Sequence, residues 1–197
     1  MNAGLPLNSI ETPCFVVDLS LLRRNLAVLD DVQKRTGAKI LLAQKAFSMF
    51  GVYPMLAKVL HGTCASSPHE AELGRDCFPG EVHAFAAAYS ERDLRELLPV
   101  CDHIIFNSFS QWNRYRPLAM QYADRVEFGL RVNPEHSEAD VPIYDPCAPA
   151  PASAFYAGIL PVRISLRFPD CISIRSAKKI PILWNARLLR LKKNSAI

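Results

Sequence analysis

A lysine at the end of an apolar run is the residue with the clearest chemical potential. The stretch AKILLAQKAF, residues 38–47, reads as a buried strand as far as Ala43, and Lys45 follows with little charge around it. One interpretation is a strand-end lysine that lays its stem on apolar surface and keeps its ammonium in water. The other is a lysine in a partly desolvated pocket, where burial disfavours the ammonium and leaves an amine nucleophile of the Schiff-base type. The spacing alone leaves both open.

The elements that must position this lysine alternate regularly between strand and helix as far as about residue 133. The hydrophobic pattern predicts strands at 14–19, 39–43, 63–66, 82–87, 103–108 and 126–133. It also predicts five helices. The first runs from its cap Ser20 to Gly37, the second spans 52–62, and the third begins at about Pro68. The fourth begins at the capping box of Ser90 and Asp93, and the fifth spans 110–123 with a bend near Pro117. Short connections in such an alternation indicate a parallel α/β architecture.

Two parallel architectures fit this alternation, a (β/α) barrel and a doubly wound sheet. The sequence has no G-x-G-x-x-G and no Walker A motif, which a phosphate-binding doubly wound sheet would favour. The predicted strands mostly end in small or polar residues, and in a barrel those ends form the catalytic face. Lys45 lies just past one of them, which favours the functional interpretation.

Composition narrows the class of protein further. The 197 residues suffice for one sizeable domain, half of them hydrophobic. The six cysteines include no C-x-x-C pair, so we expect reduced thiols and no zinc or other metal site. The start of the sequence has no signal-peptide pattern and no run of eighteen apolar residues occurs, so we expect a cytoplasmic protein that does not span a membrane.

The charge is divided unevenly along the chain. Residues 1–150 contain 14 basic and 18 acidic residues, whereas residues 151–197 contain 9 basic residues and one acid, Asp170. Beyond 150 the strand–helix alternation is lost; short β segments at 162–168, 171–174 and 180–184 and a basic helix at 185–193 are the elements we expect there. A basic helix could bind nucleic acid, but without interleaved aromatic residues we expect no nucleic-acid partner.

Six blocks of the sequence resemble one enzyme family, in the same order over about residues 5–149. They are ETPCFVVDLSLLRRNL, AKILLAQKAFSMFGVYP, GTCASSPHEAELG, GEVHAFAAAYS, HIIFNSFSQW and FGLRVNPEHSEADVPIYDPCAP. The chain is thus similar to the carboxynorspermidine (carboxyspermidine) decarboxylases, a branch of the alanine racemase-like, fold type III, pyridoxal-phosphate-dependent decarboxylases. The resemblance implies an α/β fold of the TIM-type (β/α)8 barrel, here partial and truncated after about five barrel strands.

The resemblance also implies site residues and partners. Lys45 matches the lysine that carries the cofactor, pyridoxal 5'-phosphate, and is the expected catalytic residue. Arg131 matches an arginine near the cofactor ring, with an ion pair at a strand end as the alternative; Ser66 could touch cofactor or substrate, or merely cap its strand. The substrate would be carboxynorspermidine or carboxyspermidine, and the product would be norspermidine or spermidine, in polyamine biosynthesis. The full-length members of the family form homodimers. We expect no catalysis from His69 or Glu70, and structural roles for His83, His103 and Trp112.

The sequence departs from the family in two places. Gln44 replaces an apolar residue, but strand alternation turns it to the face opposite Lys45. All resemblance stops after Cys147, where a reading-frame shift near codon 150 would explain the change of composition. We therefore expect residues 1–20 to be a strand of the family's β-domain, 21–149 a partial cofactor-binding barrel, and 150–197 a non-homologous basic tail.

Three functions remain open at this point. The first is a member of the decarboxylase family, a carboxy-lyase, that is inactive as this chain. The second is a pyridoxal-phosphate-binding protein without catalysis, although such a protein would still need a closed barrel. The third is an interaction protein that acts through the basic tail. The resemblance favours the first.

Overall fold

The computed structural model describes residues 11, 13–133, 155–156 and 171–173, and the chain divides into two compact units, residues 1–40 and 41–197. The first unit contains one helix, α1, over Leu19–Thr36. Gly37 ends it in the left-handed conformation with φ 71°, which a glycine adopts at no steric cost. The predicted C-cap is therefore confirmed. Among the described residues, none of the helices is both long and apolar enough for a membrane crossing.

The strand predicted at 14–19 is wrong. Residues 14–18 form no regular structure, and the side chain of Phe15 is 93% exposed. The helix begins at Leu19 because Asp18, and not the predicted Ser20, caps it: one Asp18 carboxylate oxygen accepts hydrogen bonds from the backbone N–H groups of Ser20 at 2.7 Å and Leu21 at 3.1 Å. In the described part of the chain, the segment before this cap has no neighbouring strand to satisfy its backbone groups, so its apolar composition alone does not make a strand.

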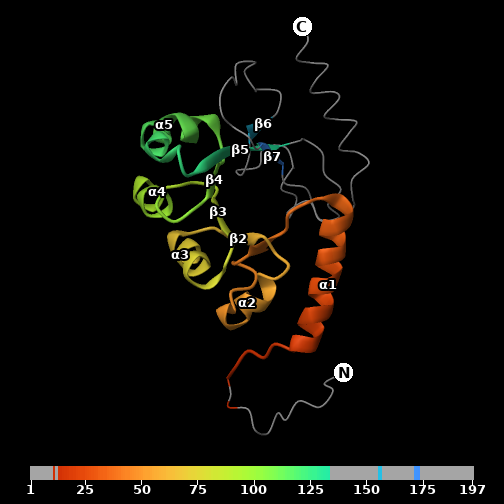
Figure 1. Ribbon diagram of the computed structural model, residues 1–197. Helices are drawn as coiled ribbons and strands as arrows, with labels where there is room; N and C mark the ends of the chain where they lie inside the picture. Colours follow the sequence, from red (N-terminus) through yellow and green to blue (C-terminus); the bar gives the residue numbers. More distant parts are fainter. Residues whose placement is uncertain (1–10, 12, 134–154, 157–170, 174–197) are drawn as a thin grey trace. The chain divides into compact units, whose positions relative to one another are not determined.

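The second unit is built on a parallel sheet whose first five strands follow the order of the chain (Figure 1). Each strand pairs with the next one in parallel register. The strands are β1 (Leu41–Ala43), β2 (Gly62–Ala65), β3 (Glu81–Phe85), β4 (His103–Phe106) and β5 (Glu127–Asn133). This sequential order, without a reversal, is that of a (β/α) barrel rather than of a doubly wound sheet.

Two short strands from the basic segment also pair with β5, and Val132 of β5 pairs with both of them. They are β6 (Phe155–Tyr156) and β7 (Cys171–Ser173), and both run parallel to β5. β7 coincides with the β segment predicted at 171–174, whereas β6 was not predicted. The other elements expected beyond residue 150 lie outside the described residues.

The helices of this unit come from the segments between strands. They are α2 (Tyr53–Leu56), α3 (Pro68–Cys77), α4 (Glu91–Leu97) and α5 (Phe109–Ala119), with 3₁₀ turns at Phe50–Val52 and Met120–Tyr122. The predicted capping box of Ser90 and Asp93 is present at the start of α4. Pro117 lies inside α5, which ends two residues later. The helix predicted at 52–62 is limited to α2, which is followed by turns at 57–59 before β2 begins at Gly62.

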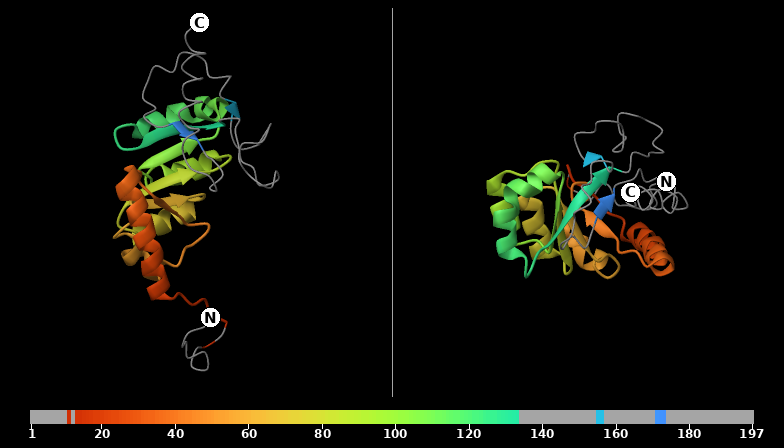
Figure 2. Two further views of the ribbon diagram at one scale, coloured as in Figure 1. Left: turned by 90° about the vertical axis from the view of Figure 1, so that its right-hand side faces the viewer. Right: turned by 90° about the horizontal axis from the view of Figure 1, so that it is seen from above.

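Helices α3, α4 and α5 lie side by side on one face of the sheet, and the core lies between them and the strands (Figures 1 and 2). Alternate strand residues point into this core, so Val82 and Ala84 of β3 are buried with Leu94 of α4. Trp112 belongs to the same cluster, as predicted. The Tyr89 hydroxyl, also buried there, accepts a hydrogen bond from the Ala86 N–H and donates one to the Ile105 carbonyl, each 3.1 Å long.

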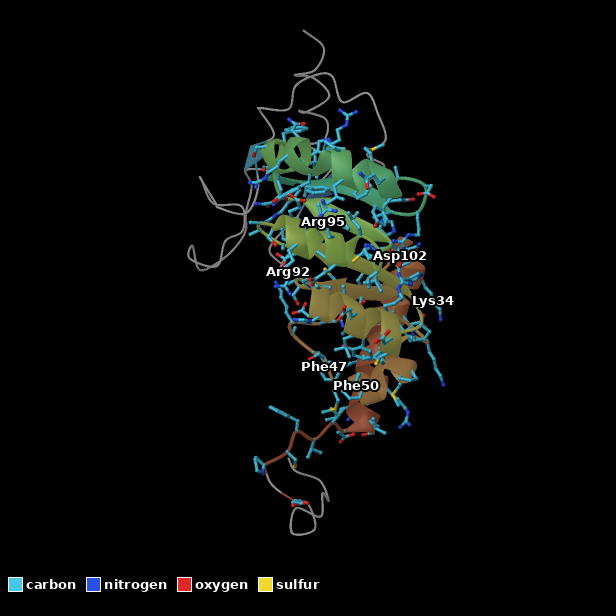
Figure 3. All side chains as sticks on the ribbon, turned by 90° about the vertical axis from the view of Figure 1, so that its left-hand side faces the viewer. Lys34, Phe47, Phe50, Arg92, Arg95 and Asp102 are labelled. Atoms are coloured by element: carbon cyan, nitrogen blue, oxygen red, sulfur yellow. The ribbon has the colours of Figure 1, made fainter. Side chains whose placement is uncertain are left out.

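The exposed faces of the covering helices are charged. On α4, Arg92 pairs with Glu96 at 3.0 Å and Arg95 with Glu91 at 2.7 Å, and both arginines project outward (Figure 3). These pairs are spaced i, i+4 and lie in water, where each contributes little to stability. The polar outer faces of these helices therefore complement an apolar inner face, which is the pattern of a helix that covers a sheet on one side.

Candidate active site

Lys45 lies in a tight turn directly after the carboxyl end of β1. The turn is fixed by backbone hydrogen bonds from the N–H groups of Ala46 and Phe47 to the Ala43 carbonyl, at 3.0 and 3.2 Å. Lys45 and both alanines are exposed. In the part of the chain described, the Lys45 side chain is therefore open to solvent.

Gln44 points away from Lys45, as strand alternation predicted. Its side chain is only 2% exposed, and its amide nitrogen donates to the Tyr53 hydroxyl at 3.4 Å. Burial raises the pKa of Tyr53. The Gln44 side chain thus lies on the face of the sheet that the helices cover. Lys45 lies on the opposite face, which we call the open face, and Gln44 adds no side chain there.

Ser66 extends the neighbouring strand, one residue past the end of β2, and is exposed. Its backbone N–H donates to the Glu70 carboxylate at 2.7 Å, while the Ser67 hydroxyl accepts from the Glu70 N–H at 3.3 Å and caps α3. Glu70 is therefore used in shaping the β2–α3 turn. The same turn sets the position of Ser66 beside the Lys45 turn.

Arg131 lies further across the sheet, in β5, and only 3% of it is exposed. Its guanidinium carbon is 5.3 Å from the centre of the Phe85 ring, an arrangement that favours a cation over an aromatic face. Arg131 is thus held on the open face of the sheet by a residue of β3. Sequence reasoning missed Phe85, because only the strand pairing brings the two residues together.

The strand register shows which site residues share one end of the sheet. Ala43 of β1 pairs with Cys64 of β2, so Lys45 and Ser66 each lie two residues beyond this pair. Lys45 is close enough to Cys64 to oppose, by its charge, the rise in the pKa of the Cys64 thiol that burial causes. The structure therefore brings Lys45, Ser66 and Cys64 together on two adjacent strands and places Arg131 three strands beyond β2.

Two aromatic side chains follow Lys45 along the chain (Figure 3). Phe47 is half-buried, whereas Phe50 is 60% exposed. An exposed phenylalanine five residues after Lys45 offers apolar surface to the ring or alkyl part of a ligand. Neither residue was predicted as a site residue, and the signal available in the sequence was only their closeness to Lys45.

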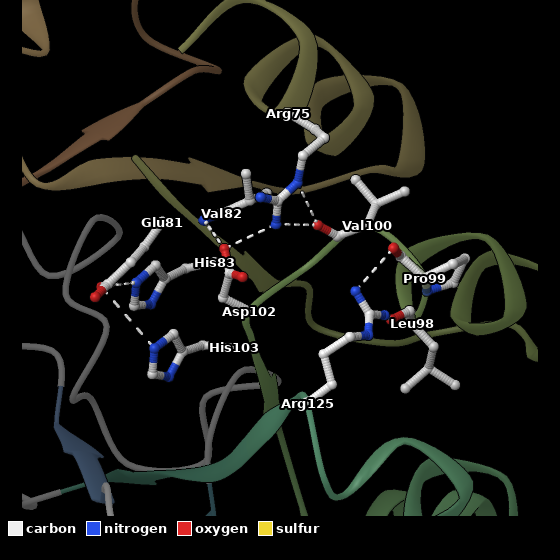
Figure 4. A network of polar contacts seen from close by, with 10 residues as sticks. All are labelled: Arg75, Glu81, Val82, His83, Leu98, Pro99, Val100, Asp102, His103 and Arg125. Atoms are coloured by element: carbon white, nitrogen blue, oxygen red, sulfur yellow. Dashed lines mark hydrogen bonds and ion pairs between the residues drawn. The ribbon is translucent and has the colours of Figure 1, made fainter. Parts of the chain in front are cut away.

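The opposite, amino ends of the strands are joined by arginines (Figure 4). Arg75 of α3 donates to the Val100 carbonyl and to the Asp102 carboxylate, the latter at 2.8 Å, and Asp102 also accepts from the Val82 N–H at 2.8 Å. Arg125 donates to the carbonyls of Leu98 and Pro99. These contacts hold α3 and the loops before β4 and β5 in place, and we assign them a structural role.

Comparison with known proteins gives curated relatives but no family model that matches. The chain is 39% identical over 163 residues to the carboxyaminopropylagmatine decarboxylase of Synechocystis, an alignment that covers 81% of this chain and 42% of that protein. It is 41% identical over 140 residues to the carboxynorspermidine/carboxyspermidine decarboxylase of Herminiimonas arsenicoxydans, which covers 71% of this chain and 37% of that protein. The chain thus spans less than half the length of these relatives.

Solved structures agree on the fold. The carboxynorspermidine decarboxylase of Campylobacter jejuni, complexed with norspermidine, superposes with a TM-score of 0.70 at 23% identity, over 94% of this chain and 47% of that chain. The diaminopimelate decarboxylase of Helicobacter pylori, complexed with L-lysine, superposes with a TM-score of 0.64 at 16% identity, over 77% of this chain and 39% of that chain. The predicted fold class, part of an alanine racemase-like barrel, is confirmed.

Proposed function

Because this chain is a homologue of part of the carboxynorspermidine decarboxylases, we propose that it derives from a pyridoxal-phosphate-dependent decarboxylase of carboxylated polyamines. The observation that carries the proposal is the position of Lys45, at the carboxyl end of β1 in a sequentially ordered parallel sheet. In (β/α) barrels this edge of the sheet is the catalytic edge. We further propose that the chain by itself does not decarboxylate.

The described residues fit one end of the proposed cofactor. Pyridoxal phosphate, when bound, supplies an electron sink for the electrons left by departing CO₂. The exposed amine of Lys45 is free to approach an aldehyde from solvent, and the buried Arg131 could face the ring from β5. Ser66 could hydrogen-bond to the cofactor or the substrate from the end of β2. These three roles are those that the family resemblance implies.

This sequence has no glycine-rich loop for the phosphate end of the cofactor. No two of its eight glycines are closer together than Gly74 and Gly80. Lys45 is exposed, and in the part of the chain described water is not excluded around its amine. Retention of the cofactor and exclusion of water would both require further residues, which supports the proposal that this chain is inactive alone. A homodimer, as in the full-length family, would be one source of such residues.

The substrate that we propose is a linear polyamine with one carboxylate, carboxynorspermidine or carboxyspermidine. The relative from Herminiimonas arsenicoxydans is named for both, whereas the one from Synechocystis is named for carboxyaminopropylagmatine. The three compounds in these names each carry a carboxylated aminopropyl amine. Comparing the rates at which an active form decarboxylates them should identify its preferred substrate.

The experiment that tests the proposal is reductive labelling of the purified chain. The chain is incubated with pyridoxal phosphate, reduced with borohydride, digested and analysed by mass spectrometry, with release of CO₂ from carboxynorspermidine measured in parallel. We expect preferential labelling of Lys45 over Lys58, an exposed lysine in the turn after α2, and no CO₂ release. Equal labelling of both lysines would refute the cofactor assignment, and CO₂ release would refute the proposed inactivity.

We also propose that residues 150–197 come from a shifted reading frame. The excess of basic residues in this segment supports the proposal, whereas the pairing of β6 and β7 with β5 shows that parts of it still add to the sheet. Sequencing the gene across codons 146–156 from source DNA tests it directly. An unchanged reading frame would refute it and would make the segment a genuine part of the protein.

A further inference from the structure

Four titratable side chains form a line across the open face of the sheet. Glu81 and His83 belong to β3, His103 begins β4 and Glu127 begins β5. His83 pairs with His103 in the strand register, and His103 pairs with Glu127. Since the intervening Val82 points into the core beneath the helices, the four side chains lie on the face that α3, α4 and α5 do not cover.

The contacts within this line are short. A carboxylate oxygen of Glu81 lies 3.1 Å from Nε2 of His83 and 3.9 Å from Nε2 of His103 (Figure 4). The other ring nitrogen of His103, Nδ1, lies 3.5 Å from a carboxylate oxygen of Glu127. One ligand atom from each of Glu81, His83 and His103 can be chosen so that all three lie within 4.8 Å of one another.

These distances are close to those of a metal-binding site. Zinc bonds of about 2.0–2.1 Å in a tetrahedral arrangement place ligand atoms roughly 3.4 Å apart. Two histidines and one glutamate form a ligand set that leaves a fourth position open. The histidine side chains are only 16% and 19% exposed, so both rings are largely shielded from solvent where they face Glu81.

We propose that Glu81, His83 and His103 bind a divalent transition metal ion of the zinc type, with Glu127 as the residue that positions His103. Metal-bound histidines commonly donate their second ring N–H to a carboxylate, which fixes the ring and its tautomer. Glu127 occupies that place relative to His103 Nδ1. The site would join β3 to β4 and, through Glu127, to β5.

Binding requires a local rearrangement of the two rings. The imidazoles of His83 and His103 are stacked, with centroids 4.1 Å apart and planes 8° from parallel, so their nitrogen lone pairs do not converge on one point. Each ring must turn about its Cβ–Cγ bond, a torsion with a broad energy minimum. Metal binding should therefore break the stack and change the environment of both rings.

The proposal is tested by titrating the full chain, free of any histidine tag, with cobalt(II) and zinc(II). We expect visible cobalt absorption at one equivalent without the near-ultraviolet charge-transfer band of a cobalt–thiolate, and competition by zinc. In ring-proton NMR spectra, zinc should shift two histidines out of five. Absence of binding, a thiolate band, or shifts in other histidines would overturn the proposal.

Variants locate the metal independently. His83→Gln and His103→Gln should abolish the cobalt absorption, and Glu127→Gln should weaken binding by about 10- to 100-fold, as loss of an orienting carboxylate does. The matched control is His69→Gln, because His69 also faces a carboxylate, that of Glu72 at 3.9 Å, but on the exposed surface of α3. Circular dichroism checks that each variant is folded, and equal binding by control and His83→Gln would overturn the proposal without reference to stability.

Discussion

Replacing Gly74 by alanine tests the packing of α3 on the strands that lead to Lys45 and Ser66. A Cβ at position 74 would lie 2.5 Å from the Thr63 hydroxyl oxygen and 3.2 Å from the Gln44 side-chain oxygen. Thr63 is completely buried and its β-branched side chain has few alternatives. Overpacking of this kind costs about 1–3 kcal/mol. The gain in helix propensity from glycine to alanine, about 1 kcal/mol, offsets part of it.

The effect of Gly74→Ala on the free energy of unfolding should change sign once the clash with the Thr63 hydroxyl is removed. In a Thr63→Ala background the oxygen at 2.5 Å is gone, and the remaining contacts are the longer ones to the Gln44 oxygen at 3.2 Å and to the Cβ of residue 63 at 3.4 Å. We expect Gly74→Ala alone to lower the free energy of unfolding, by up to about 2 kcal/mol after the propensity gain. In the Thr63→Ala background it should raise that free energy, by up to about 1 kcal/mol.

Urea unfolding of the four proteins, followed by far-ultraviolet circular dichroism, measures this cycle. The coupling between the two sites should be about 1–3 kcal/mol, well above the few tenths expected for independent positions. Gly51→Ala serves as the control, because a Cβ there meets no atom within 4 Å, and it should show no coupling to Thr63→Ala. Additive effects of Gly74→Ala and Thr63→Ala would refute the packing argument.

Three further outcomes are expected. Tyr89→Phe removes the hydroxyl that joins the partly buried Ala86 N–H to the buried Ile105 carbonyl. It should lower the free energy of unfolding by about 1–3 kcal/mol in urea titrations, whereas an unchanged midpoint would contradict this. Hydrogen bonds from the Ser90 hydroxyl and backbone lower the pKa of Asp93. The stabilising effect of the Asp93 carboxylate should therefore be present above about pH 4 and be lost as the pH falls further. Asp93→Asn should flatten this part of the plot of unfolding free energy against pH. Burial raises the pKa of the Cys101 thiol to about 12. A thiol reagent should therefore label the exposed Cys14 at once and Cys101 only after unfolding. Equal labelling rates of the two cysteines would contradict the structure.

Sequence pattern predicted those elements whose signals are local. The capping box of Ser90 and Asp93 and the glycine end of α1 depend on neighbouring residues alone, and both were found. The strand predicted at 14–19 depended on a partner that local pattern cannot supply. The helix at 52–62 was overestimated because an apolar run before a glycine resembles a helix end even where the chain enters a strand.

The site was predictable only as far as single residues. Lys45 could be selected because a lysine after an apolar run is conspicuous, and resemblance then gave it a role. The exposure of its surroundings could not be predicted, since it depends on what lies over the strand ends. Phe85 beneath Arg131 and the pairing of His83 with His103 arise from strand register, which sequence leaves undetermined when helices separate the strands.

The chain-order pairing of β1 to β5 also bears on how the protein is made. Each strand finds its partner in the strand–helix unit synthesised just before it, so no strand from β2 to β5 must wait for a distant segment. Folding during synthesis can therefore proceed one unit at a time from the amino-terminal side as the chain leaves the ribosome. An early intermediate of this kind would expose its last strand as a growing edge, and each newly emerging unit would cover it in turn.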